Sequence, residues 1–65
     1  MDIEINQRAV HLPEGCTLAE LLSSQGFTPP YAVAINTRFI PRSAYAQTPI
    51  QAGDQVEVIT PVTGG

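Results

Sequence analysis

The chain has a single cysteine, Cys16, and a single histidine, His11, among its 65 residues. A domain this small buries only about 60% of the surface of its unfolded chain, so many domains of this size add disulfides or a structural metal. One thiol cannot form a disulfide within the chain. One thiol and one imidazole also fall short of the roughly four ligands of a structural zinc site or an iron–sulfur cluster. The fold must therefore be stabilised by regular strands, a helix and a packed apolar core.

Composition is consistent with such a core. Hydrophobic residues make up 43% of the chain and charged residues 14%, which does not resemble a disordered segment. The length predicts one domain over residues 1–65, with a flexible C-terminal tail at residues 61–65. The net charge is −3, from three arginines and no lysine against six acidic residues. Because nucleic-acid binding needs a basic face, nucleic acid is not an expected partner, whereas a basic protein surface is a compatible one.

The apolar runs are too short to cross a membrane. The longest is five residues, Tyr31 to Ile35, whereas a spanning helix needs about 20. No basic segment precedes an apolar stretch near Met1, so no signal peptide is expected. Together with the lone thiol, these features predict a cytoplasmic protein that contacts no membrane. We expect the free chain to be a monomer.

The first residues alternate with the period of a half-buried strand. Met1, Ile3 and Ile5 lie on one side of it, and polar residues lie on the other. Residues 6–8 are typical of a tight turn, and residues 9–12 continue the alternation. Two such runs joined by a short turn predict a β-hairpin.

The clearest local signal is a helix start. Thr17 and Glu20 have the spacing of a capping box, in which each side chain accepts a hydrogen bond from the other's backbone N–H. The apolar stripe of this helix is Leu18, Leu21 and Leu22, which we expect in the core. Gly26 suits the left-handed position after the last turn, so the helix is predicted at residues 18–25. A helix this short is marginal in water and must pack on a sheet.

Three more segments are typical of strands. Residues 31–36 are apolar apart from the final Asn, as in an interior strand. Residues 39–40 form a short strand after a turn, and residues 55–62 alternate after a Gly-Asp turn. Between them, residues 42–51 have no clean period, which predicts irregular structure with at most one short turn of helix.

This order, β-β-α-β-β-β, predicts an α+β fold of the β-grasp, or ubiquitin-like, type. One main helix would pack on one face of a four- to five-stranded mixed sheet. The first and last strands can be parallel neighbours, because the segment between them is long enough for a crossover.

The last two residues are Gly64 and Gly65. Their ordinary interpretation is a frayed terminus. The alternative is a carboxylate presented to a partner, because glycine has no Cβ and can enter a narrow slot, and five extended residues span roughly 17 Å. A main-chain carboxylate, with an ordinary pKa near 3.3–3.7, is a poor electrophile. It would first need a leaving group, such as the AMP of an acyl-adenylate.

Five stretches of the chain, in order and spacing, resemble the ThiS family of sulfur-carrier proteins of thiamine (thiazole) biosynthesis. They are Ala34-Ile35-Asn36, Ile40-Pro41-Arg42, Tyr45-Ala46-Gln47, Gly53-Asp54-Gln55-Val56-Glu57-Val58 and Gly64-Gly65. The resemblance covers nearly the full length, and the Pro-Arg pair separates this family from its nearest relatives. Two departures are minor. Tyr45 stands where Trp is frequent, and Pro61 is unusually close to the last residue.

The resemblance implies a protein co-substrate rather than an enzyme, with no catalytic side chain, bound cofactor or metal. An E1-like adenylyltransferase (ThiF type) would form an acyl-adenylate on Gly65. Sulfur from a cysteine-desulfurase persulfide would then convert it to a thiocarboxylate, 1-thioglycine. Thiazole synthase (ThiG type) would receive that sulfur. Gly65 is then the sulfur-carrying residue, and Gly64 gives it access to the partner.

Other chemistry-bearing residues have plainer interpretations. Cys16 precedes the helix cap, where a small apolar residue packs, so a structural role is expected rather than a sulfur relay. His11 has no second ligand, so no metal site is expected. Arg38 and Arg42 are either solvated or, for Arg42, part of a partner-docking site. Ile59 falls on the face opposite Val56 and Val58, where it is either a docking residue or buried under a loop.

Three other functions fit parts of this pattern. The small subunit of molybdopterin synthase uses the same C-terminal chemistry, but those chains are usually longer and lack the Ile-Pro-Arg pattern. A ubiquitin-like protein modifier would be conjugated to lysines through Gly65. A nucleic-acid-binding β-grasp module, as found on some tRNA synthetases, is disfavoured by the acidic charge. The absence of lysine suggests a further hypothesis, that an activated Gly65 meets no ε-amine on another copy of the chain.

Overall fold

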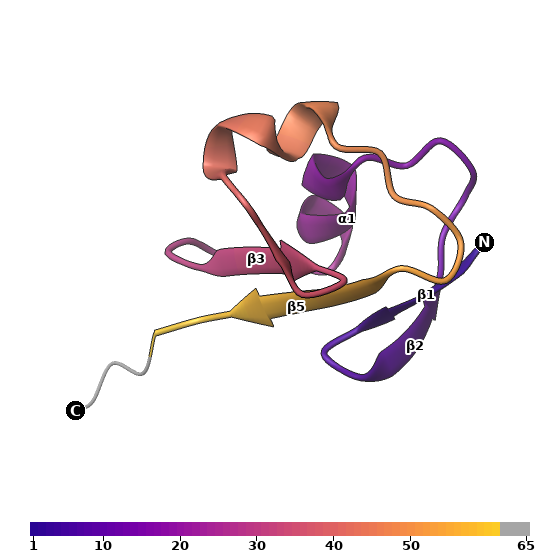
Figure 1. Cartoon of the computed structure of the whole chain (residues 1–65), viewed down its shortest axis with the longest axis horizontal. Coiled ribbons are helices and arrows are strands. Elements are labelled where there is room, and N and C mark those ends of the chain that lie inside the picture. The colour runs from indigo at the N-terminus through magenta and orange to yellow at the C-terminus, as the bar shows by residue number, and fades with distance from the viewer. Residues whose placement is uncertain (62–65) are drawn as a thin grey trace.

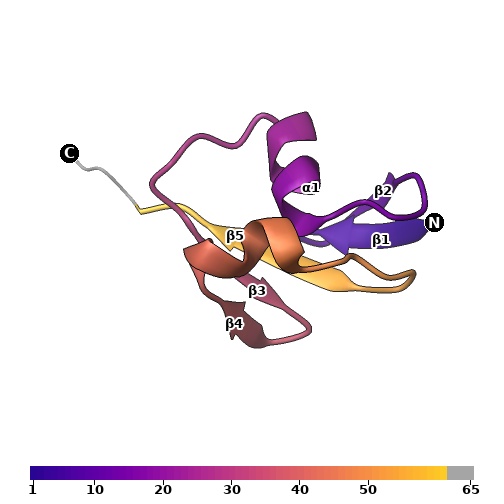
Figure 2. The same ribbon diagram turned by 90° about the horizontal axis from the view of Figure 1, so that it is seen from above.

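A computed structural model describes residues 1–61 of the chain. Its elements are β1 (Asp2–Ile5), β2 (Arg8–His11), α1 (Leu18–Ser24), β3 (Ala32–Ile35), β4 (Arg38–Ile40), the 3-10 helix η1 (Arg42–Gln47) and β5 (Gln55–Ile59). The strands form one mixed sheet in the order β2-β1-β5-β3-β4. Both helices lie on the same side of it (Figures 1 and 2). The predicted β-grasp fold is therefore confirmed, with five strands.

The last strand is the centre of the sheet. β5 runs parallel to β1, with Ile5 opposite Val56, and antiparallel to β3, with Val33 opposite Val58. The predicted parallel pairing of the first and last strands is thus confirmed. The opening hairpin is also present, and it extends by one more pair, because Met1 and Leu12 exchange two backbone hydrogen bonds of 2.6 and 2.8 Å.

The core lies between the sheet and α1. Its buried apolar residues are Ile3, Ile5, Leu12, Cys16, Leu18, Leu21, Leu22, Val33, Ile35, Tyr45, Ile50, Val56 and Val58. The predicted leucine stripe of α1 is among them. Alternate residues of each central strand point into this layer, as the period-2 pattern requires. Across residues 1–61, no buried polar side-chain atom lacks a hydrogen-bond partner.

Helix α1 begins with the predicted capping box. The Thr17 hydroxyl accepts the Glu20 N–H at 3.2 Å, and the Glu20 carboxylate accepts the Thr17 N–H at 2.9 Å. The helix ends at Ser24, one residue earlier than predicted, and Gln25 caps it. Gly26 has the expected positive φ of 75°. In this conformation a Cβ is disfavoured, which explains the glycine.

The segment predicted to be irregular contains η1, a 3-10 helix of six residues. Backbone bonds join its C-terminal end to the start of α1, from Leu18 N–H to the Thr48 carbonyl at 2.8 Å and from Ile50 N–H to the Cys16 carbonyl at 2.9 Å. Tyr45 is buried and stacks on Tyr31, with ring centroids 6.1 Å apart. These contacts hold η1 beside α1 on the covered face of the sheet.

Three predicted boundaries are wrong. Each hairpin turn has two residues, 6–7 and 36–37, so Arg8 and Arg38 lie in strands although the sequence pattern predicts both in turns. The last strand was predicted to reach residue 62, but β5 ends at Ile59, where its partner β3 has its first residue, Ala32. Thr60 follows β5 and is exposed.

Candidate functional site

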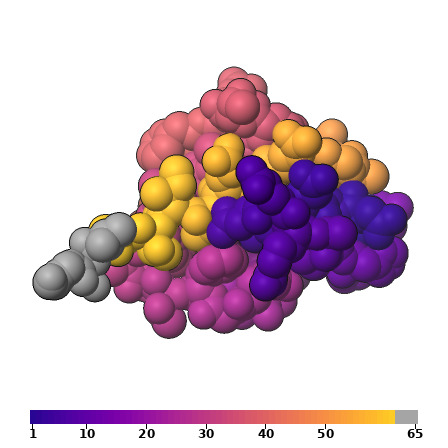
Figure 3. Space-filling view, turned by 90° about the horizontal axis from the view of Figure 1, so that it is seen from below, coloured from indigo at the N-terminus to yellow at the C-terminus, as the bar shows by residue number. Residues whose placement is uncertain are grey.

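One face of the sheet has no helix on it, and we call it the open face. Residues directly opposite one another on neighbouring strands point to the same side. The register therefore places Phe39, Ala34 and Glu57 in one row of this face, and Ala32 and Ile59 in the next. Figure 3 shows this face, with the yellow atoms of β5 beside the indigo atoms of β1 and β2.

The open face has an apolar patch on β3, β4 and β5, which consists of Ala32, Ala34, Phe39 and Ile59. Phe39 is 65% exposed and Ile59 is 59% exposed, and they are the exposed large hydrophobic residues of the described chain. The interpretation of Ile59 as buried under a loop is therefore wrong. Large exposed apolar side chains that lie together typically mark interaction sites, so a docking role for Ile59 stays a prediction.

Acidic side chains flank this patch. Glu57 lies in the same row as Phe39, and Glu4 lies opposite Gln55 on the neighbouring strand. A shallow hollow of about 330 Å³ lies between β1 and β5 and is lined by Glu4, Gln7, Gln55, Val56 and Glu57. Because both carboxylates are on the outer face, a partner that covers it would have to present cationic groups beside its apolar ones.

The end of β5 is the point at which the chain leaves the sheet. Thr60 and Pro61 follow Ile59 outside any strand. In Figure 1, β5 points away from the end of the molecule that holds Met1. Gly64 and Gly65, predicted as the access and sulfur-carrying residues, lie outside the described residues. The structure thus places the base of this segment next to the apolar patch.

The two predicted docking residues are on different sides of the sheet. Ile59 is on the open face, whereas Arg42 is the exposed first residue of η1, on the side of α1 (Figure 2). Arg38 is the first residue of β4, where it pairs with Ile35, and it is also exposed. A partner that lies flat on the open face would therefore contact Ile59, whereas the backbone of Arg42 lies on the other side of the sheet.

Cys16 is buried at the start of α1 and its thiol donates to the Thr17 carbonyl at 3.5 Å. Burial raises the pKa of the Cys16 thiol, and the nearby Glu20 carboxylate raises it further. Because the thiolate is the reactive form, both effects oppose a role as a nucleophile. The structural role expected for Cys16 agrees with this position.

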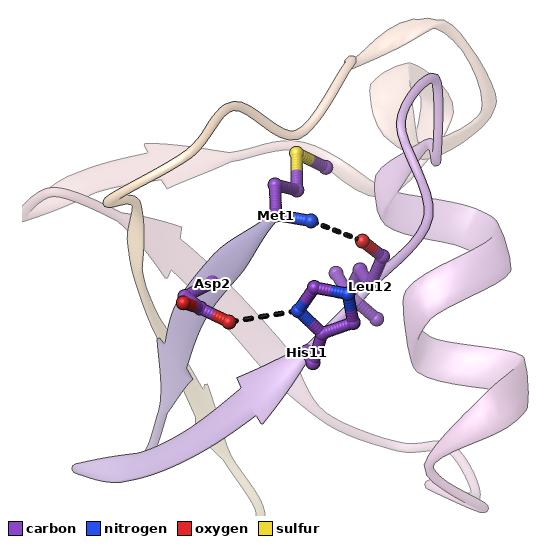
Figure 4. A network of polar contacts seen from close by, with 4 residues as sticks. All are labelled: Met1, Asp2, His11 and Leu12. Atoms are coloured by element: carbon purple, nitrogen blue, oxygen red, sulfur yellow. Dashed lines mark hydrogen bonds and ion pairs between the residues drawn. The ribbon is translucent and has the colours of Figure 1, made fainter.

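His11 pairs with Asp2 across the β1–β2 hairpin. The imidazole Nδ1 and the Asp2 carboxylate are 2.8 Å apart, beside the bond from the Met1 ammonium to the Leu12 carbonyl (Figure 4). The hydrogen bond and charge of His11 lower the pKa of Asp2. Within residues 1–61, no group of three or more His, Cys, Asp or Glu side chains could hold a metal ion.

Two residues of the site were missed from the sequence. The sequence pattern predicts Phe39 only as part of a short strand. Its outward direction follows from the two-residue turn before it, which sets Phe39 opposite Ala34. Asn6 was read only as a turn residue, yet its side chain binds the backbone of Val58 near the end of β5. An Asn at the first position of the turn predicts the turn, but it does not predict the contact with Val58.

The mixed sheet with a parallel first and last strand, one capped helix on one face and an open apolar patch on the other define a β-grasp, ubiquitin-like protein. A scan against protein families matches the ThiS family over residues 2–65. The chain belongs to the ThiS family.

Solved structures agree with this assignment. The chain is similar to the crystal structure of the thiamine biosynthesis protein ThiS from Geobacter metallireducens, at 26% identity and a TM-score of 0.86 over the whole of both chains. It is also similar to a solution NMR structure of a thiamine biosynthesis protein from the same organism, at 28% identity and a TM-score of 0.82, over all of this chain and 88% of the other. A search of curated proteins finds no match to this chain. Among residues 1–61, no helix is long and apolar enough to span a membrane.

Proposed function

We propose that this protein is the sulfur carrier of thiamine biosynthesis and that Gly65 carries the sulfur. The observation that carries the proposal is the match to the ThiS family, because it extends over residues 2–65 and so includes Gly64 and Gly65. The two solved structures named above are thiamine biosynthesis proteins. In this proposal neither the buried Cys16 nor His11, which is paired with Asp2, takes part in the chemistry.

The chemistry would proceed on the main-chain carboxylate of Gly65. An E1-like adenylyltransferase would join this carboxylate to the α-phosphate of ATP with loss of pyrophosphate, and the product is an acyl-adenylate. The terminal sulfur of a cysteine-desulfurase persulfide would then displace AMP to form an acyl disulfide. A second thiol would attack the remaining sulfur of the donor, forming a disulfide with it and releasing the thiocarboxylate. Thiazole synthase would consume this sulfur. In this scheme the folded body serves recognition, and Gly64 lets the backbone enter a narrow active site because it has no Cβ.

We expect the adenylyltransferase to dock on the open face. The apolar patch ends at Ile59, immediately before the segment that leads to Gly65, so one partner can hold the patch and reach the C-terminal residues together. Glu4 and Glu57 would then meet basic side chains of the enzyme. Arg42 is the alternative contact, on the other side of the sheet.

The proposal is tested by intact mass after incubation with ATP, the adenylyltransferase and a sulfide source. Replacement of one oxygen by sulfur should add about 16 Da to the wild-type chain. A chain that lacks Gly65 should show no gain, and Gly64→Val should charge more slowly because its side chain must pass the same slot. An unchanged mass for the wild type would contradict the proposal.

The docking prediction is tested with Phe39→Ser and Ile59→Ser. Each change removes exposed apolar area, so binding to the adenylyltransferase should weaken by about tenfold, the equivalent of roughly 1.4 kcal/mol. Arg42→Ala examines the other side of the sheet, and Glu14→Ala in an exposed loop is the control. Calorimetry measures the affinities. If Arg42→Ala weakens binding and the two patch variants do not, docking on the open face is wrong.

A further inference from the structure

The pairing between β1 and β5 stops before β5 ends. The last backbone bond of this parallel ladder joins the Asn6 N–H to the Val56 carbonyl at 2.9 Å. In a regular parallel ladder, the Asn6 carbonyl would next accept the N–H of Val58. This does not happen, because Asn6 has a φ of 50° and turns the chain toward β2.

The side chain of Asn6 supplies the missing bonds. Its Oδ1 accepts the Val58 N–H at 2.9 Å, and its Nδ2 donates to the Val58 carbonyl at 3.3 Å. On the other side of β5, the Asn36 N–H bonds to the Gln55 carbonyl. Because bonding alternates along an antiparallel pair, the N–H and carbonyl of Val58 point away from β3 and toward β1. Asn6 is therefore the partner of both groups.

This contact lies at the base of the C-terminal segment. Val58 is followed by Ile59, the last residue of β5 and part of the apolar patch. Beyond the reach of β1, β5 has β3 on one side and the Asn6 amide on the other. Loss of the amide would leave the end of β5 attached along one edge only.

We infer that Asn6 is a positioning residue for the C-terminal segment. Its amide fixes the end of β5, and with it the place beside the apolar patch from which residues 60–65 continue. The inference rests on the proposed function, because a fixed exit matters when an enzyme docks on the open face and must reach Gly65. A carrier without this contact has to order the end of β5 when it binds, which weakens binding rather than the chemical step.

The second hairpin provides a matched control. Asn36 occupies the same turn position, with a φ of 51°. Its Oδ1 accepts the Gln55 N–H at 3.0 Å, and its Nδ2 donates to the Asp54 carboxylate at 3.1 Å. It therefore holds the other end of β5, away from the C-terminal segment.

The first measurement is amide hydrogen exchange in Asn6→Gly and Asn36→Gly. Glycine accepts the positive φ in both turns, so each variant loses mainly the side-chain bonds. Exchange at Val58 should accelerate about tenfold in Asn6→Gly, consistent with the loss of one or two hydrogen bonds, and by less than threefold in Asn36→Gly. The Gln55 amide should show the reverse. Equal protection of Val58 in the wild type and Asn6→Gly would overturn the inference without any enzyme present.

The second measurement is the steady-state charging of each folded carrier by the adenylyltransferase. Asn6→Gly should raise KM by about fivefold with kcat within about twofold, whereas Asn36→Gly should leave both within about twofold. Asn6→Asp keeps the acceptor for the Val58 N–H. Its KM should therefore lie between that of Asn6→Gly and that of the wild type. A KM for Asn6→Gly equal to that of the wild type would overturn the positioning role. If the wild type itself is not charged, the proposed function fails, and the exchange data still decide whether Asn6 fixes β5.

Discussion

At the scale of single residues, the hairpin turns carry backbone strain. Asn6, Gln7, Asn36 and Thr37 all have positive φ, between 50° and 69°. This is the pattern of the two-residue turns that match the twist of a β-hairpin, and Asn followed by Gly is its preferred sequence. Gln7 and Thr37 stand where Gly would be unstrained. Thr37 is the more costly of the two, because its Cβ is branched.

The change Thr37→Gly should therefore stabilise the protein. Relief of the left-handed conformation gains about 1–2 kcal/mol, and the greater freedom of glycine in the unfolded chain costs about 0.5–1 kcal/mol. A net gain of up to about 1.5 kcal/mol should appear as a higher urea midpoint. Ser23→Gly, in α1 and without a positive φ, is the control and should destabilise. A lower midpoint for Thr37→Gly would show that the hydrogen bond from its hydroxyl to the Asn36 carbonyl outweighs the strain.

The sequence predicted the position of a site residue where local alternation sets it, and did not where a contact between distant segments sets it. The outward direction of Ile59 followed from simple alternation with Val56 and Val58, and it is confirmed by its exposure. The sequence could not predict whether a loop covers Ile59, because the position of a loop depends on packing between distant segments. The role of Asn6 was not readable either, because residues 6 and 58 meet only through the parallel pairing of β1 and β5.

At the scale of elements, α1 shows how a short helix is specified. It has seven residues, fewer than an isolated helix needs in water. Its capping box satisfies backbone groups at the first turn, and its leucines bury one side against the sheet. These local signals were all visible in the sequence, which is why the helix was placed to within one residue.

Because of the capping box, the free energy of unfolding should depend on pH in the acidic range. The hydrogen bond from the Thr17 backbone lowers the pKa of Glu20 below its ordinary value of 4.5, with a further contribution from the Thr17 hydroxyl. A carboxyl whose pKa is lower in the folded state adds stability above its unfolded pKa, and that stability is lost as the pH falls through the folded value. Glu20→Gln keeps a hydrogen-bond acceptor but cannot titrate. Its stability should therefore fall less than that of the wild type as the pH drops below 4.5.

Urea unfolding at a series of pH values measures this difference. Glu14→Gln removes another carboxylate and leaves the capping box intact, so it should keep the acid dependence of the wild type. Identical pH profiles for the wild type and Glu20→Gln would mean that the capping carboxylate does not contribute to folding.

Strand ends were predicted less well than the helix, for a physical reason. The end of a strand depends on where its neighbours end, and that is a property of the sheet rather than of the segment. The alternation in residues 55–62 continues past Ile59, but β3 has no residue to pair beyond Ala32. Of the sheet order, the sequence predicted only the parallel pairing of the first and last strands, which the structure has, and left the places of the other strands open.

At the scale of the whole molecule, the two faces of the sheet have separate tasks. The covered face holds the core. Residues 1–61 contain one free cysteine and no cluster of side chains that could hold a metal ion. The open face exposes Phe39 and Ile59 beside the end of β5. A chain of this size has little stability to lose, so the residues proposed for docking can be varied only if they contribute little to folding.

This separation predicts that truncating a side chain on the covered face lowers stability much more than truncating one on the open face. Leu21 is fully buried, so Leu21→Ala should destabilise by about 2–5 kcal/mol, from lost burial and from the cavity left behind. Because a core of this size supplies only about 3–5 kcal/mol, much of that variant should be unfolded at room temperature. Phe39→Ala removes a mostly exposed ring and should change stability by less than about 1 kcal/mol. Urea unfolding followed by circular dichroism compares the two. A large loss of stability in Phe39→Ala would show that the open face is part of the folding core, and weaker enzyme binding by its variants would then no longer identify a docking surface.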